Sequence, residues 1–111
     1  MKKKEALDAF AALSQETRLD VFRLLIKRLP EAMPAGDIAK EMDVPPSTMS
    51  THLAILSRAG LVKSERNGRV ISYVADLNGV RDLLAFLVKD CCSGKTDACN
   101  DLIEAVLPAC C

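Results

Sequence analysis

The 111-residue sequence lacks the residue patterns on which many enzymes depend. His52 is its single histidine, which argues against a histidine-based zinc site and against Ser-His-Asp or Cys-His catalysis. A glycine-rich phosphate loop is also missing, because Gly94-Lys95-Thr96 lacks the upstream glycine and the strand context of a P-loop. We therefore expect a protein that is not an enzyme, with no catalytic residues and no organic cofactor.

Long apolar segments are missing as well. No apolar run approaches the ~20 residues that span a bilayer, and Met1-Lys2-Lys3-Lys4-Glu5 lacks the apolar stretch of a signal peptide. The hydrophobic share of 50% is enough for a globular core. These features predict a cytoplasmic protein with no membrane partner.

Cysteine is absent from residues 1–90, and all five cysteines follow: Cys91, Cys92, Cys99, Cys110 and Cys111. A disulfide framework would place cysteines throughout the fold of a secreted protein. The clustering predicts two parts. Residues 1–90 form a domain that folds without thiols, and residues 91–111 form a cysteine-rich C-terminal sensing segment.

The net charge is zero, but its distribution is uneven. Residues 1–43 carry eight basic and eight acidic side chains, and residues 76–111 carry three basic and six acidic ones. Residues 44–75 carry Arg58, Lys63, Arg66 and Arg69 against Glu65 alone, a balance of +3. A local basic patch of this kind, more than the overall charge, is what a phosphate backbone experiences.

Helical periodicity predicts two helices in the first thirty residues. The first covers Ala6–Leu13. The second has Ser14 as its N-cap, runs to about Arg28, and ends at Leu29-Pro30 because the residue before a proline disfavours helix.

Two further helices follow, joined by a short turn. Gly36–Met42 predicts a short helix, Asp43-Val44-Pro45 a tight turn, and Ser47–Arg58 a second helix. Met49, Leu53 and Leu56 in this second helix have the spacing of a buried stripe. This is the helix-turn-helix pattern, whose second helix enters the major groove of DNA.

A β-hairpin is predicted next, from strands Leu61–Arg66 and Arg69–Ala75 around Asn67-Gly68. Asn-Gly tolerates the positive φ angles of a type I′ turn, so it is a strong hairpin signal. A hairpin with basic residues at its tip, placed after a recognition helix, is a wing.

The candidate DNA-contacting residues lie on the second helix of the motif and on this wing. They are Ser47, Thr48, Ser50, Thr51, His52, Arg66, Asn67 and Arg69. Short hydroxyl side chains can bond phosphates and base edges, and arginines can bind phosphates. The alternative is a merely solvated helix face and a hairpin whose arginines serve solubility or edge protection.

A final long helix is predicted over about Gly79–Lys89, capped by Asn78 or Asp76. Its apolar arc is broader than one small core needs, which indicates a dimer interface shared with the N-terminal helix. The predicted fold is mainly α with a small β-hairpin: a homodimeric winged helix-turn-helix.

The sequence resembles the ArsR/SmtB family of metal- and metalloid-responsive repressors up to about residue 90. The resemblance is carried by four segments: Leu13–Leu19, Gly36–Ala39, Ser50–Leu56, and Ala59–Val62 leading to the wing. It implies a homodimer formed by the first and last helices and a two-fold symmetric operator in double-stranded DNA. It also implies a repressor that leaves DNA when its inducer binds.

Two departures from the family bear on the inducer. Gly36–Met42 lacks the Cys-x-Cys that some members carry in the first helix of the motif, and Val80–Lys89 lacks the histidine ligands of zinc sensors. Cys91, Cys92 and Cys99 resemble instead the arsenite-responsive members whose ligands follow the last long helix.

Trivalent arsenic is soft and takes three thiolates, so Cys91, Cys92 and Cys99 are the predicted ligands. Cys110 and Cys111 are candidate additional ligands. Antimony or methylated arsenic would suit the same thiols, and cadmium or lead is a further alternative. A closed Cys₄ zinc site, a buried structural role, and a redox or sulfide switch through a disulfide also remain open.

Overall fold

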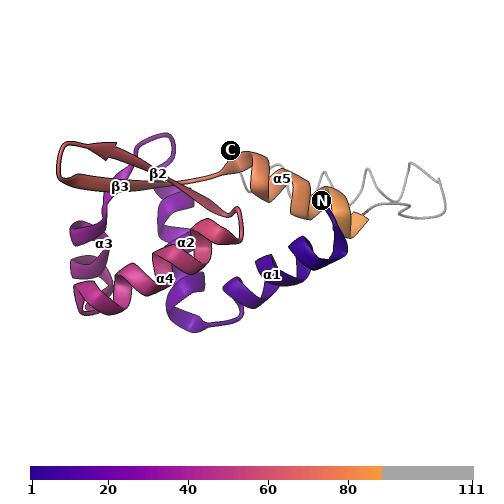
Figure 1. Cartoon of the computed structure of the whole chain (residues 1–111), viewed down its shortest axis with the longest axis horizontal. Coiled ribbons are helices and arrows are strands. Elements are labelled where there is room, and N and C mark those ends of the chain that lie inside the picture. Colours follow the sequence, from indigo (N-terminus) through magenta and orange to yellow (C-terminus); the bar gives the residue numbers. More distant parts are fainter. Residues whose placement is uncertain (89–111) are drawn as a thin grey trace.

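The computed structural model describes residues 1–88, and Figure 1 shows their arrangement. In this part of the chain the elements are α1 (Lys3–Leu13), α2 (Glu16–Arg28), β1 (Met33–Pro34), α3 (Ala35–Met42), α4 (Pro46–Arg58), β2 (Val62–Asn67), β3 (Val70–Ala75) and α5 (Leu77–Val88). The predicted mainly helical winged helix-turn-helix fold is confirmed. The predicted sensing segment, 91–111, and its five cysteines lie outside the described residues.

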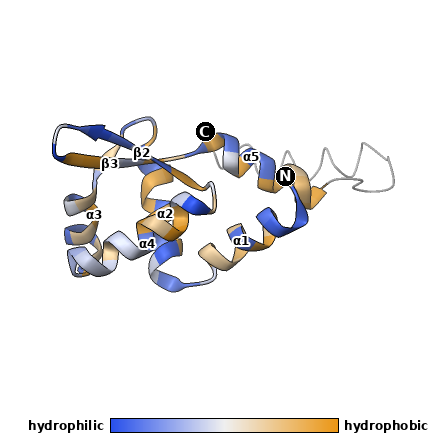
Figure 2. Ribbon diagram, viewed as in Figure 1, coloured by the Kyte–Doolittle hydropathy of each residue, from blue (hydrophilic) through white to orange (hydrophobic). Residues whose placement is uncertain are grey.

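The core is built around α4. Met49, Leu53 and Leu56 are fully buried at the predicted spacing, together with Val21 and Leu25 of α2 and Ile38 of α3. Burial of each large apolar side chain stabilises the fold by about 1.5–3 kcal/mol. Hydrophobic residues gather along α2 and β3, whereas β2 is hydrophilic (Figure 2). The core therefore joins the three central helices to one side of the hairpin.

The sheet has three strands in the order β1-β3-β2, all antiparallel, so the predicted hairpin is only part of it. β1 pairs Met33 with Tyr73 and Pro34 with Ser72. Two residues, one of them proline, carry no alternating pattern, which is why the sequence did not predict this strand. Proline lies here on an edge strand, where its missing N–H removes no central ladder bond.

The turn of the hairpin differs from the prediction. Asn67 is the last residue of β2 and pairs with Val70, so the two loop residues are Gly68 and Arg69. Gly68 has a φ of 63°, whereas Arg69 does not have a positive φ. Type I′ turns need positive φ at both loop residues and type II′ turns only at the first. The predicted type I′ turn at Asn67-Gly68 is therefore wrong, although the hairpin itself is confirmed.

The helix caps also differ in detail. Ser14 donates its hydroxyl to the carbonyl of Ala11 (2.9 Å) and so ends α1, while Gln15 Oε1 accepts from the Arg18 amide (2.9 Å) and caps α2. At α5, Asp76 Oδ1 accepts from the amides of Asn78 (3.0 Å) and Gly79 (3.4 Å). The predicted Ser14 cap is thus wrong, and Asp76 is the cap of α5.

The first turn of α5 is seated against the end of α4. The Leu61 amide donates to the Leu56 carbonyl (3.1 Å), and the Asp76 amide donates to the Leu61 carbonyl (2.9 Å). Gly79 packs so closely on Gly60 that a Cβ at Gly79 would overlap the Gly60 carbonyl oxygen. Glycine at residue 79 is therefore needed for this close approach of two backbone segments.

We predict that Gly79→Ala destabilises the fold by about 1–3 kcal/mol, because backbone atoms that cannot rotate away must shift. Gly36→Ala is the matched control, since Gly36 is also helical but a Cβ there meets no atom within 4 Å. Helix propensity should make the control more stable by up to ~1 kcal/mol. Urea-unfolding midpoints measure the stability of both variants relative to wild type. Stabilisation of both variants would contradict the predicted close packing at Gly79.

Candidate nucleic-acid interface

The outward face of α4 carries hydroxyl side chains. Ser47, Thr48, Ser50 and Thr51 are exposed, whereas the stripe of Met49, Leu53 and Leu56 is buried. The Thr51 hydroxyl donates to the Ser47 carbonyl within the helix (3.4 Å). Because these side chains are short, the α4 backbone can approach a groove closely.

The turn between α3 and α4 sets the direction of this face. Asp43 has φ 53° and ψ 48°, the left-handed conformation that Asp tolerates better than most residues. Its amide donates to the Lys40 carbonyl (3.2 Å), and the Val44 amide donates to the Ala39 carbonyl (3.0 Å). Pro46 then begins α4 without needing an N–H partner. The predicted helix-turn-helix geometry is confirmed.

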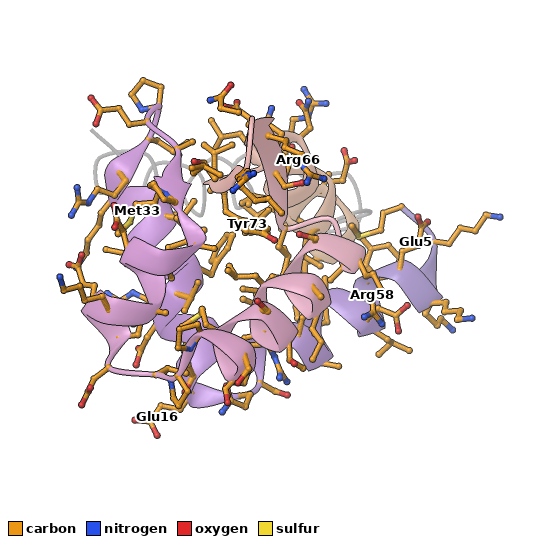
Figure 3. The ribbon with its side chains drawn as sticks, turned by 60° about the vertical axis from the view of Figure 1, so that its left-hand side comes forward. Glu5, Glu16, Met33, Arg58, Arg66 and Tyr73 are labelled. Carbon is orange, nitrogen blue, oxygen red and sulfur yellow. The ribbon has the colours of Figure 1, made fainter. Side chains whose placement is uncertain are left out.

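The wing presents its polar residues to solvent. Arg66, Asn67 and Arg69 are all exposed, as is Lys63 farther along β2. Arg66 Nε donates to the Gly68 carbonyl (3.2 Å), which ties the guanidinium of this exposed side chain to the turn. Figure 3 shows Arg66 on the hairpin above α4. Wing and recognition helix thus supply hydroxyl and guanidinium donors from adjoining elements.

The basic residues of this surface are not neutralised by ion pairs found in residues 1–88. The two pairs there join Arg28 to Glu41 (3.4 Å) and Arg81 to Asp82 (4.0 Å). Lys63, Arg66 and Arg69 belong to neither pair, so their charge is available to phosphates. Arg58 also belongs to neither pair, but it lies at the last turn of α4 near Glu5 of α1, apart from Arg66 (Figure 3).

His52 differs from the other candidates on α4. It is half-buried, and its Nδ1 lies 3.4 Å from Nη1 of Arg18 on α2. Sequence reasoning did not assign Arg18 to the site, because no local pattern signals a contact between residues that lie 34 positions apart.

The predicted arsenic ligands Cys91, Cys92 and Cys99 lie outside the described residues, as do the candidate additional ligands Cys110 and Cys111. Within residues 1–88, no group of three or more His, Cys, Asp or Glu side chains could hold a metal ion. The helices of this part are also too short or too polar to cross a bilayer.

Comparison with known proteins supports the assignment of the fold. A helix-turn-helix domain family matches residues 13–65. The HTH-type transcriptional regulator YbzH of Bacillus subtilis is 32% identical over 95 residues, covering 75% of this chain and 95% of YbzH. The chain belongs to the helix-turn-helix transcriptional regulators. The transcriptional repressor SdpR of the same organism is 29% identical over 90 residues, with 81% of this chain and 97% of SdpR covered.

The fold of this regulator is similar to solved structures of ArsR-type winged helix proteins. An ArsR-like transcriptional regulator from Rhodococcus sp. RHA1 is 27% identical and superimposes with a TM-score of 0.70, over 93% of this chain and 92% of that one. A homodimeric winged helix-turn-helix DNA-binding domain from Mycobacterium bovis, 23% identical, shares the fold with a TM-score of 0.64 over 77% of each chain.

If the wing binds phosphates, Arg66→Ala and Arg69→Ala should each weaken binding to any duplex and reduce the slope of log Kobs against log salt by roughly 0.9. Arg81→Ala is the control, because Arg81 is an exposed arginine on α5. Fluorescence anisotropy at several salt concentrations gives the slopes. Identical slopes for all three variants would show that the wing arginines do not touch DNA.

Proposed function

We propose that this regulator is a homodimeric repressor that binds operator DNA through α4 and the wing and is released when trivalent arsenic binds Cys91, Cys92 and Cys99. The observation that carries the DNA-binding part is the exposed hydroxyl face of α4 beside an exposed basic wing. Half-sites about one helical turn apart, roughly 34–36 Å, would suit a two-fold symmetric pair of such units. Similarity to the transcriptional repressor SdpR supports the proposal that the protein represses transcription.

The dimer is supported by an apolar surface at the other end of the molecule, where α1 and α5 contact each other (Figure 1). The exposed apolar side chains of these two helices include Leu7, Phe10, Leu84, Leu87 and Val88. Only Leu83 of α5 is buried. The exposed positions recur at intervals of three and four, so each helix presents one apolar face. A second copy of the chain would cover both faces, as the homodimeric M. bovis domain suggests.

Leu84→Glu should convert the dimer to a monomer at micromolar concentration, because it places a charge within an apolar interface. Val70→Glu is the control, since Val70 on the wing has the same exposed fraction as Leu84, 50%. Sedimentation velocity measures the assembly state. A Leu84→Glu dimer as tight as wild type would place the interface elsewhere.

The arsenic part of the proposal rests on the chemistry of the thiols and on their place in the chain. Three thiolates suit a soft trivalent ion, whereas carboxylates and water suit harder ions. Cys91 follows the last residue of α5, Val88, by three positions. A ligand gathering residues 91–99 would therefore act on the end of α5.

A short route connects α5 to the recognition helix. The first turn of α5 packs on Gly60. The next residue, Leu61, makes backbone hydrogen bonds to Leu56 of α4 and to Asp76, which precedes α5. A displacement of α5 would reach α4 through these contacts. Regulation needs a coupling free energy of only about 1–3 kcal/mol between the ligand site and the DNA site.

Cys91→Ser, Cys92→Ser and Cys99→Ser should each bind operator like wild type but no longer release it with arsenite. Anisotropy of a labelled duplex from the gene's upstream region, under a non-thiol reductant, measures release. Cys110→Ser and Cys111→Ser, tested in parallel, show whether the terminal pair contributes, and zinc is the control ion.

Release of wild type near one arsenite per subunit, with zinc inert, would support the proposal. If all three variants still respond to arsenite, the ligands lie elsewhere. Release by an oxidant and recovery with reductant, with arsenite inert, would replace arsenic by the thiol redox alternative.

A further inference from the structure

Arg18 links three elements through one guanidinium group. Its Nε donates to the Ala12 carbonyl (2.7 Å) and its Nη2 to the Ala11 carbonyl (3.5 Å), both in the last turn of α1. Its Nη1 lies 3.4 Å from His52 Nδ1 on α4. The two carbonyls at the negative end of the α1 dipole orient the guanidinium independently of His52.

This arrangement constrains the protonation of His52. A guanidinium carries N–H donors and no acceptor, so the ring nitrogen that faces it must be the acceptor. In the neutral ring one nitrogen is a donor and the other an acceptor, and the proton therefore belongs on Nε2. No hydrogen bond within residues 1–88 uses Nε2, and Ser57 Oγ is the only buried side-chain N or O atom there that lacks a partner, so Nε2 is accessible to solvent.

We propose that Arg18 is a positioning residue that selects the Nε2–H tautomer of His52, so that His52 offers DNA a hydrogen-bond donor. The predicted acceptor is a base atom on the major-groove edge, such as N7 or O6 of guanine. His52 would then contribute to sequence discrimination, while its exposed neighbours Ser50 and Thr51 can donate or accept. This inference rests on the placement of α4 in the groove under the proposed function.

The tautomer can be measured on the free protein. His52 is the single histidine, so a ¹⁵N-histidine label reports one ring. At a pH where the ring is neutral, the ¹⁵N spectrum should show Nδ1 unprotonated and Nε2 protonated in wild type. Arg18→Lys keeps the charge but replaces the three guanidinium nitrogens, which contact three different groups, by a single ammonium nitrogen, and it should introduce the Nδ1–H form. A protonated Nδ1 in wild type, or an Arg18→Lys spectrum identical to wild type, would overturn the proposal.

Two amide variants of His52 separate its two nitrogens. Asn places a polar atom near the Nδ1 position and can still accept from Arg18, but it does not reach the Nε2 position. Gln places its amide donor near Nε2. His52→Gln should retain operator affinity within a few-fold, whereas His52→Asn should lose about tenfold or more, since one base contact contributes ~1–3 kcal/mol to discrimination. Urea-unfolding midpoints check that both variants fold equally.

Sequence preference distinguishes a base contact of His52 from a merely structural role, because a structural role would not change it. When the base pairs of the footprinted half-site are substituted one at a time, at least one substitution should lower the affinity of wild type and of His52→Gln but not that of His52→Asn. Equal loss of affinity on every duplex, or Asn binding as well as Gln, would overturn the base contact. If wild type binds no duplex from the upstream region, the proposed function fails, while the tautomer measurement still tests the role of Arg18. If Arg18→Lys does not fold, the proposal is tested by the wild-type ¹⁵N spectrum and by the comparison of His52→Gln with His52→Asn.

Discussion

Burial of one stripe on α4 is the constraint on which the rest of the molecule depends. Met49, Leu53 and Leu56 are fully excluded from solvent, and they pack in one cluster with residues of α2 and α3. A helix buried along one side has its opposite side fixed toward solvent. The hydroxyl groups of α4 therefore face outward because the apolar stripe faces inward. Loss of that stripe would remove the core and the orientation of the hydroxyl face of α4 together.

The fold separates two tasks along its length. The helix-turn-helix and the wing place short polar groups and cations at one end, whereas α1 and α5 leave apolar surface at the other (Figures 1 and 2). Two of the contacts that bridge these regions lie next to α4. One joins the first turn of α5 to Gly60 and Leu61, directly after α4, and the other joins the last turn of α1 to His52 through Arg18. Both helices with exposed apolar faces are thus in direct contact with groups that position the recognition helix.

Most of the fold and four residues of the α4 face could be predicted from local pattern. The helices, the turn at Asp43 and the hairpin follow from apolar spacing, proline and glycine, each acting over a few residues. β1 escaped prediction because two residues show no period, and the hairpin loop was misplaced by one residue because Asn-Gly and Gly-Arg both supply the glycine a tight turn needs. The cysteine site stays a prediction from thiol chemistry.

The sequence by itself determined which segments are helical, which faces are apolar, and where thiols and cations gather, because each property repeats within a few residues. Tertiary structure decided the relations between distant positions. It brought Arg18 to His52, gave Gly79 a place against Gly60, and left His52 half-buried while its neighbours Ser50 and Thr51 are exposed. These contacts depend on how whole elements pack, and packing is set by the summed burial of many side chains rather than by any local pattern.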